Sequence, residues 1–226
     1  MPRPIIPPHG GYKALITYRK SDLVFRGTAI FVRRFLKPGD RTIGQMEQAA
    51  RSGKQNIIEG SEASATSKAT ELTLTNVAKA SLEELLEDYL DYLKLHSLPE
   101  WPKDSPKGLA ARRLCRDADW TTLSSRLETA SPETAANLLI CLIRQCTYLL
   151  ARQIARLETD FTLHGGIRER MHAARTTARA STWETAAHSR LSAAHTPAEL
   201  DALLASMTDT LHRLADSIRR KNGWPT

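Results

Sequence analysis

Arginine side chains at regular spacing are the feature of this sequence that most suggests chemistry. Arg19, Arg26 and Arg33 lie seven residues apart, which on a helix places them on one stripe at intervals of about 10 Å. Guanidinium groups in such a row can contact successive phosphates and bind a nucleic acid without reading its bases. The predicted phosphate contacts are Arg19, Arg26, Arg33, Arg34, Lys37, Arg51 and Lys54.

The same cations also have a structural interpretation. Surface charges need no special explanation, and arginines can pair with carboxylates within or between subunits. A run of carboxylates further along the chain could supply the partners, or bind a cation: Glu83, Glu84, Glu87, Asp88 and Asp91. A basic edge that meets this acidic edge would build a heterologous ring. No aromatic residue interleaves with the basic stripe on its exposed side, so the sequence does not support base stacking there.

Enzymatic chemistry finds little support in the sequence. Asn56 and Glu59 lie near each other on a helix, but no nucleophile or metal ligand is in register with them. We interpret them as groups that satisfy the backbone near a helix end. Gly53-Lys54-Gln55 lacks the glycine spacing and the Ser or Thr of a phosphate loop, and the seven histidines and three cysteines show no metal-ligand spacing. We expect no enzyme, no cofactor and no metal.

Composition and charge distribution restrict the class of protein further. The 226 residues carry a net charge of +7, and residues 1–60 hold eleven basic and four acidic side chains, whereas residues 61–100 hold three and eight. Such a polarised surface suits a polyanionic partner on one side. No uninterrupted apolar run approaches the roughly 18 residues that span a bilayer, and the N-terminus lacks a signal-peptide stretch. An odd number of cysteines is typical of reduced thiols, so we expect a cytoplasmic protein with no membrane role.

Apolar residues at intervals of three and four predict an almost wholly helical chain. Proline and glycine make residues 1–18 a predicted flexible arm. A first helix should begin at a Ser21 cap and end before Pro38, and a second should run from Arg41 to Gly60, where glycine ends it. Gly53, on its inner side, would allow a neighbouring helix to approach closely.

Cap and breaker residues place the remaining helices. A third helix should follow a Thr66 or Ser67 cap and end near Leu98, and a short helix is predicted near residues 109–116. Ser131-Pro132-Glu133 has the form of a cap followed by a first-turn proline and an acid, and this helix should end near residue 163. Further helices are predicted over residues 167–180 and 197–221. Long amphipathic helices with short connections are typical of an antiparallel bundle.

Residues 45–60 read Q-M-E-Q-A-A-R-S-G-K-Q-N-I-I-E-G, and their ending is an Asn-Ile-X-Glu-Gly pattern formed by Asn56, Ile57, Glu59 and Gly60. This stretch resembles the second helix of the four helix bundle protein family, first noted as proteins encoded in intervening sequences of 23S rRNA genes. Residues 136–153 and 165–171 resemble the fourth helix and the C-terminal suffix of a subgroup. The resemblance covers about residues 19–180.

The resemblance implies both an architecture and a function. The fold expected is an all-α, antiparallel up-down four-helix bundle over residues 19–163, with an irregular insertion at about 98–131 and a helical appendage over 164–226. A well-understood relative, the accessory variability determinant of diversity-generating retroelements, is a homopentameric ring that binds a reverse transcriptase and nucleic acid. The resemblance therefore implies a homo-oligomer, a pentamer, with RNA or DNA and a reverse transcriptase as partners.

Two functional hypotheses follow. The first is a non-enzymatic, oligomeric, nucleic-acid-associated scaffold that is accessory to a reverse transcriptase. The second is a protein–protein interaction module whose basic face forms subunit or partner contacts and has no nucleic-acid role. Residues 181–226 resemble no family, and they are the part of the chain that keeps an enzymatic role as a third alternative.

Overall fold

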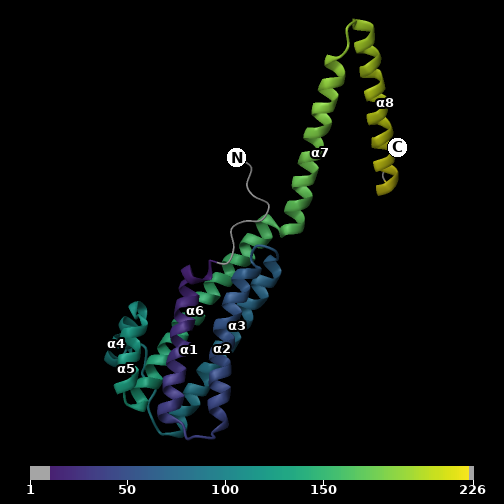
Figure 1. The fold of residues 1–226 in the computed structure, drawn as a ribbon. Coiled ribbons are helices and arrows are strands. Elements are labelled where there is room, and N and C mark those ends of the chain that lie inside the picture. The colour runs from purple at the N-terminus through teal and green to yellow at the C-terminus, as the bar shows by residue number, and fades with distance from the viewer. Residues whose placement is uncertain (1–10, 224–226) are drawn as a thin grey trace. The chain divides into compact units, whose positions relative to one another are not determined.

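Every regular element in the described part of the chain is a helix, which confirms the predicted all-α class (Figure 1). The computed structural model describes residues 11–223, apart from the side chains of residues 164, 168 and 170. A 3-10 turn, Tyr12–Ala14, precedes the long helices. These are α1 (Ile16–Phe35), α2 (Arg41–Ala63), α3 (Lys68–Leu95), α4 (Pro106–Asp117), α5 (Trp120–Thr129), α6 (Pro132–His164), α7 (Ile167–Ser192) and α8 (Pro197–Asn222).

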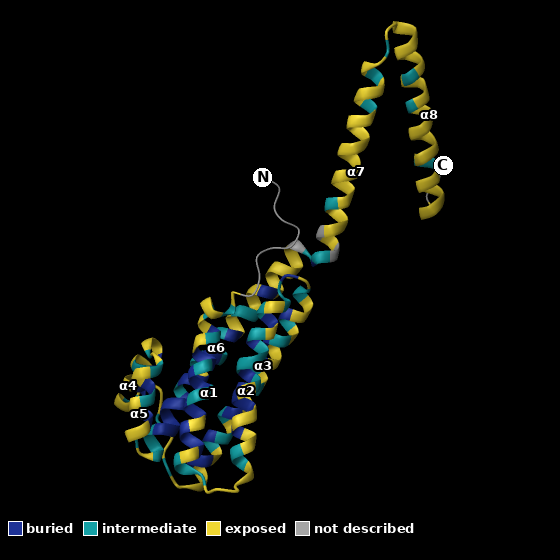
Figure 2. Ribbon diagram, in the orientation of Figure 1, coloured by how far each residue is buried: buried dark blue, intermediate teal, exposed yellow. Residues whose placement is uncertain are grey.

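Helices α1, α2, α3 and α6 form the predicted four-helix bundle (Figure 1). The contacting pairs are α1 with α2, α2 with α3, α3 with α6, and α6 with α1, so each helix touches two neighbours around a common core. The buried side chains come from all four helices (Figure 2) and include Val24, Phe31, Met46, Leu82 and Leu139, none of which is accessible to solvent. Burial of these stripes is the main stabilising term for the bundle.

Two glycines let bundle helices approach closely. A Cβ atom added at Gly53 would lie 2.7 Å from the side chain of Leu82 on α3, and one added at Gly27 would lie 2.7 Å from Leu139 on α6. Real Cβ atoms do not come this close to a neighbour, so only glycine fits without a shift of the packed leucine. For Gly53, this close approach of a neighbouring helix was predicted from the sequence.

Within the bundle, several predicted helix ends are correct and two are wrong. The side chains of Ser67 and Ser131 accept hydrogen bonds from the backbone of Thr70 and Thr134, as expected of N-caps. Helix α1 begins at Ile16 rather than at Ser21, which lies buried inside the helix. Most of the predicted N-terminal arm, residues 1–10, lies outside the described residues.

The second wrong end is that of α2. This helix continues three residues beyond Gly60, to Ala63. A Cβ at Gly60 would lie 3.4 Å from that of Leu74 on α3, so this glycine serves the approach of α3 rather than a left-handed cap. Tertiary packing has overridden the local stop signal.

The insertion between α3 and α6 is more regular than predicted. It forms two helices, α4 and α5, whose N-caps are Ser105 and Asp119. Helix α4 packs against α6, and α5 packs against α1. The insertion thereby covers one side of the bundle, and it brings side chains from three separate parts of the chain together.

The described chain divides into two compact units, residues 1–170 and 171–226. Helix α7 continues to Ser192, twelve residues beyond its predicted end, because the Ala-rich link that follows residue 180 favours helix. Helix α8 agrees with the prediction to within one residue. It begins with a capping box between Thr196 and Glu199, and it ends at Gly223 in the left-handed conformation.

Helix α6 departs from the expectation that no segment of the chain is long and apolar enough to span a bilayer. By length and composition it could cross a membrane, with a mean hydropathy of 1.3 over its most apolar window. In the structure, 56% of that window is buried, because the apolar side of α6 packs against α1 and α3. The core helix of a bundle has the same composition, so the apolar residues of α6 are explained by the fold.

Candidate functional site

Four of the seven residues predicted to contact phosphate instead bind other residues of the same chain. Arg26 on α1 stacks over the ring of Trp120, 3.7 Å from its centroid, and lies 3.6 Å from the carboxylate of Asp22. Lys54 on α2 reaches the same carboxylate at 3.5 Å, and its ammonium lies 4.0 Å from the ring centroid of Phe25. Arg26 thus connects α1 to α5, and Lys54 connects α2 to α1.

The other two of these four cations, Arg33 and Arg34, lie at the C-terminal end of α1. Arg33 forms an ion pair with Glu128 of α5. Arg34 donates hydrogen bonds to the backbone carbonyls of Leu127 and Ala130, the latter at 3.1 Å. Both carbonyls lie at the C-terminal end of α5, where backbone acceptors lack partners within the helix. The two arginines therefore act as a C-terminal clamp on α5.

The other three predicted contacts are exposed but scattered. The side chains of Arg19, Lys37 and Arg51 make no hydrogen bond or ion pair that the structure records between described residues, and all three are exposed. Arg19 and Lys37 are eighteen residues apart, about 27 Å along a helix axis. The predicted row of phosphate contacts is therefore interrupted in the folded chain.

The acidic run on α3 does not pair with these cations. Glu83 lies 2.6 Å from Lys79, and Asp91 lies 3.0 Å from Lys94, both on α3 itself. The carboxylates that meet the basic stripe come instead from α1 and α5. Asp88 is different, because its buried Oδ2 has no hydrogen-bond partner among the described residues. Burial raises the pKa of Asp88, with Glu84 and Asp91 adding to the effect.

The Asn-Ile-X-Glu-Gly ending of α2 has a structural role. Asn56 donates hydrogen bonds to the backbone carbonyl and hydroxyl of Ser52, at 2.9 and 3.1 Å, and Ile57 is buried in the core. Glu59 is exposed and accepts a hydrogen bond from Gln55 at 3.3 Å. The hydrogen bonds of Asn56 and Glu59 stay within α2, whereas Gly60 lies against α3.

A second basic cluster, which the sequence analysis did not single out, lies between α4 and α6. A pocket of about 460 Å³ lies where α4 packs on α6, and a second hollow of about 470 Å³ adjoins it. Arg112, Gln145 and Tyr148 line both. We define the α4–α6 basic face as the exposed side chains around these hollows: Lys103, Arg112, Arg113, Arg116, Arg144 and Tyr148.

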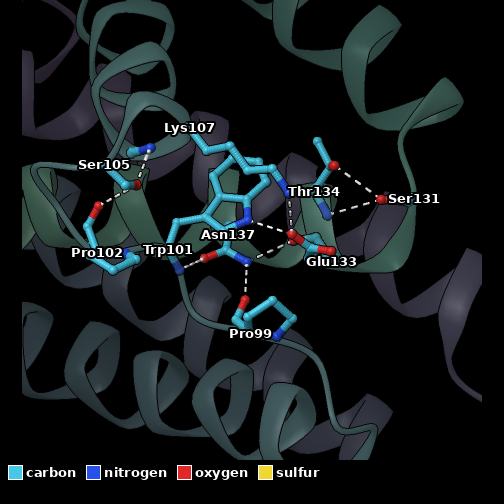
Figure 3. A network of polar contacts seen from close by, with 10 residues as sticks. Pro99, Trp101, Pro102, Ser105, Lys107, Ser131, Glu133, Thr134 and Asn137 are labelled. Carbon is cyan, nitrogen blue, oxygen red and sulfur yellow. Dashed lines mark hydrogen bonds and ion pairs between the residues drawn. The ribbon is translucent and has the colours of Figure 1, made fainter.

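A polar network fixes the segment before α4 against the first turns of α6 (Figure 3). Asn137 accepts a hydrogen bond from the backbone of Trp101 at 2.7 Å and donates one to the carbonyl of Pro99 at 3.0 Å. Glu133 accepts from the indole of Trp101 at 2.6 Å and from Lys107 at 2.9 Å. These two hydrogen bonds lower the pKa of Glu133. Loop, α4 and α6 are thereby held in one arrangement.

The base of the cluster is a buried ammonium group. Lys20 of α1 donates hydrogen bonds to the carbonyl of Cys115 at 2.7 Å, to that of Arg116 at 3.3 Å, and to Gln145 at 2.9 Å. These partners belong to α4 and α6, so one side chain ties three helices together. Burial lowers the pKa of Lys20, because desolvation disfavours its charged form.

A half-buried thiol lies in the same pocket. The neighbouring thiol of Cys115, with the charges of Arg112 and Lys20, lowers the pKa of Cys141. The amide of Gln145 lies 3.8 Å from its sulfur atom. Among the described residues, no group of three or more His, Cys, Asp or Glu side chains is placed to hold a metal ion.

Tyr148 gives this face a property that the basic stripe of α1 lacks. Its side chain is 63% exposed and lies in the wall that the two hollows share. Arginines bind phosphates, and an exposed ring can stack on a base. The sequence signal that could have been noticed is the Arg112-Arg113 pair followed by Arg116. No sequence pattern indicated that Tyr148, more than thirty residues later, lies beside it.

Comparison with known proteins adds no assignment: no protein-family model, no curated protein and no solved structure matches the chain. The structure supports the resemblance noted above at a coarser level, that of an all-helical protein with a four-helix core.

Proposed function

We propose that this chain is a non-enzymatic, oligomeric scaffold that associates with nucleic acid through the α4–α6 basic face. The observation that carries the proposal is the exposed ring of Tyr148 among arginines from two helices. A basic groove with an aromatic platform is the arrangement by which proteins bind single strands without sequence preference. This function keeps the class expected from the sequence and moves its site from α1 and α2 to α4 and α6.

The charges on this face are available to an anionic partner. Arg112 and Arg113 are exposed, and no ion pair to either occurs among the described residues. Arg144 lies 2.6 Å from Glu100, and Arg116 lies 2.9 Å from Asp117. Both pairs are solvent-exposed, and exposed pairs contribute about 1 kcal/mol or less. A phosphate can therefore replace these carboxylates at little cost.

The resemblance to the four helix bundle protein family supports the rest of the proposal. By that resemblance the scaffold is a homopentamer in the cytoplasm, RNA or DNA is its ligand, and a reverse transcriptase is its protein partner. The matching residues are Asn56, Ile57, Glu59 and Gly60 with the helical pattern around them. Their contacts within α2 are those of a helix that supports a bundle.

The test compares two double charge reversals with the same change in net charge. Arg112→Glu with Arg113→Glu removes two free arginines of the α4–α6 basic face, whereas Arg19→Glu with Arg51→Glu removes two exposed arginines from α1 and α2. Fluorescence anisotropy with a labelled 20-nucleotide single-stranded RNA, at 50 and 200 mM salt, measures each Kd. We expect the first variant to weaken binding at least tenfold and to reduce the salt slope by about two. The second should weaken it two- to threefold.

Tyr148→Ala separates stacking from charge. We expect it to weaken single-stranded RNA binding about tenfold, as loss of one stacked base does, and to leave binding to a duplex of the same length unchanged. Equal losses for both charge reversals would contradict the proposed location. Absence of binding by the unmodified chain at 50 mM salt would contradict the function.

A second candidate function is a protein–protein interaction module without a nucleic-acid role. The observation that favours it is the use of Arg26, Arg33, Arg34 and Lys54 in contacts within the chain, which shows that arginines here serve packing. In that case Arg112→Glu with Arg113→Glu would dissociate a complex with an acidic partner chain or subunit. Light scattering of the variant would reveal a lower mass, and RNA would not compete.

A further inference from the structure

Helix α8 carries a continuous apolar stripe at the spacing of a coiled coil. We define the α8 seam as its members, which succeed one another at intervals of four, three, four, three and four residues: Leu200, Leu204, Met207, Leu211, Leu214 and Ile218. This alternation keeps all six on one side of a helix over five turns. It is the pattern of a helix whose apolar side meets another helix along its whole length.

The seam is flanked by small or uncharged residues on both sides. The neighbouring positions are Asp201, Leu203, Thr208, Thr210, Ala215 and Ser217, of which only Asp201 is charged. The other charges of the central turns lie on the opposite side, where Arg213 pairs with Asp209 at 2.8 Å and Arg219 pairs with Asp216 at 3.1 Å. Such segregation predicts a wide contact face, as in a bundle of helices.

Helix α7 lies beside this face but buries none of its residues. None of the residues of α8, all of which the structure describes, is buried (Figure 2). Leu204 is 45% exposed, Leu211 48% and Leu214 59%. A hollow of about 360 Å³ lies between α7 and α8, lined by Trp183 and Met207 among others. Helix α7 therefore touches the seam from one side and leaves it unfilled.

The two ends of α8 carry opposite charges, which favours a second copy of the same helix as its partner. Glu199 and Asp201 lie in its first turns, and Arg219, Arg220 and Lys221 lie in its last. Two copies of this helix in antiparallel orientation place the acidic end of each beside the basic end of the other. In parallel orientation, like charges would meet at both ends.

The dimensions of the helix also suit a second copy. Twenty-six residues span about 39 Å, and a helix is about 10 Å wide, so one face of α8 offers about 400 Å². Together with an equal face of α7, a hairpin offers about 800 Å², which is the area that each partner contributes to a typical stable interface.

We propose that the α8 seam docks, antiparallel, against α8 of a second copy of this chain, so that two α7–α8 hairpins form an intermolecular four-helix bundle. This contact would join protomers through a surface separate from the α4–α6 basic face. It gives residues 171–223 a role as an assembly element, for which burial of the seam leucines supplies the driving force.

The primary test places charges on the seam of the full-length chain. Leu204→Glu with Leu211→Glu puts two carboxylates on the stripe, and Ala205→Glu with His212→Glu puts two on the adjacent exposed side at the same spacing. Analytical ultracentrifugation measures mass and association constant. Each seam contact pairs two copies, so in a ring of five it would pair two rings. We therefore expect the seam variant to raise the dissociation constant of this pairing about 100-fold or more and to halve the mass, while the control keeps the mass of the unmodified chain.

A second variant tests orientation without changing the seam. Asp201→Lys should weaken association several-fold in an antiparallel pair, because it places a cation beside the basic end of the partner. Adding Arg220→Glu and Lys221→Glu should restore it. Circular dichroism confirms that each variant keeps its helical content.

Three results would overturn the proposal. One is an unmodified chain that is monomeric at 100 µM, as expected if the seam is covered within its own chain. Another is a seam variant whose mass equals that of the control. A third, against antiparallel pairing, is an Asp201→Lys variant that is not rescued. RNA binding through the α4–α6 basic face should persist in the seam variant, so the two proposals fail separately.

Discussion

Helix α3 of the bundle and helix α8 of the C-terminal unit are similar in length, and both carry apolar residues at intervals of three and four, but they have different surroundings. In α3, the apolar residues Ala78, Leu82, Leu85 and Tyr89 are wholly inaccessible to solvent. In α8, an equally regular apolar stripe has no buried member. The pattern of a sequence predicts that a helix has a face to bury, whereas the identity of the surface that buries it depends on the rest of the chain or on another molecule.

The two helices also differ in what stabilises them. Isolated helices are marginal in water, and most helical stability in proteins comes from packing. Helix α3 is held on two sides, by α2 and α6. Helix α8 relies on local devices, namely its capping box and its left-handed glycine cap. Perturbations of equal size should therefore have unequal effects in the two units.

The largest expected difference is in the response to loss of a leucine side chain. Leu139→Ala empties a fully buried site on α6 and should lower the free energy of unfolding of the bundle by about 2–5 kcal/mol. Leu214→Ala, at a 59% exposed position on α8, should leave that transition within about 0.5 kcal/mol. Urea titration followed by circular dichroism measures both. Equal losses would show that the seam is part of the same core.

Two glycines of α2 allow a finer test within the bundle. Gly53→Ala forces a Cβ to 2.7 Å from Leu82 and should destabilise by about 1–3 kcal/mol. At Gly44, on the same helix, an added Cβ meets no described atom within 4 Å, so Gly44→Ala should stabilise by about 0.5–1 kcal/mol through better helix propensity. Thermal melting distinguishes the opposite signs. Two shifts of the same sign would contradict the packing between α2 and α3.

The smallest expected effect is a pH-dependent gain at Asp88. Burial raises the pKa of Asp88, so the folded state binds its proton more tightly than the unfolded state does. The ionised carboxylate then destabilises the fold at neutral pH, and this penalty disappears as the pH falls through the raised value toward 3.8.

Asp88→Asn should accordingly raise the Tm at pH 7 and lose its advantage below about pH 4. Glu47→Gln, at an exposed position on α2, is the matched control and should shift the Tm little at either pH. Differential scanning calorimetry at the two pH values measures the effect. An advantage that is equal at both would show that the carboxylate is not the cause.

The sequence predicted most of the helices because their signals are local. Ser67 and Ser131 identify the starts of α3 and α6 by capping geometry, which involves only three or four neighbouring residues. The wrong ends, at Ser21 and Gly60, lie where a neighbouring helix buries the residue. There a long-range contact decides whether the helix continues, and no short window of sequence contains it.

The candidate site shows the same limit more strongly. The seven-residue spacing of Arg19, Arg26 and Arg33 correctly places them on one side of α1. However, Arg26 stacks on Trp120 and Arg33 pairs with Glu128, so two of the three side chains are already bound. Those partners lie on α5, about a hundred residues away. The α4–α6 basic face was missed because Arg112 and Tyr148 become neighbours only when α4 packs on α6.

The amino-acid sequence by itself determined that this chain is helical, where α3 and α6 begin, and which side of each helix is apolar, because these properties follow from intervals of a few residues. The tertiary structure alone decided which cations of the bundle remain unpaired, which glycines are pressed against leucines, and that helix α7 does not bury the α8 seam. Ion pairing, close packing and burial all depend on distances between residues far apart in the chain, and folding is what sets those distances.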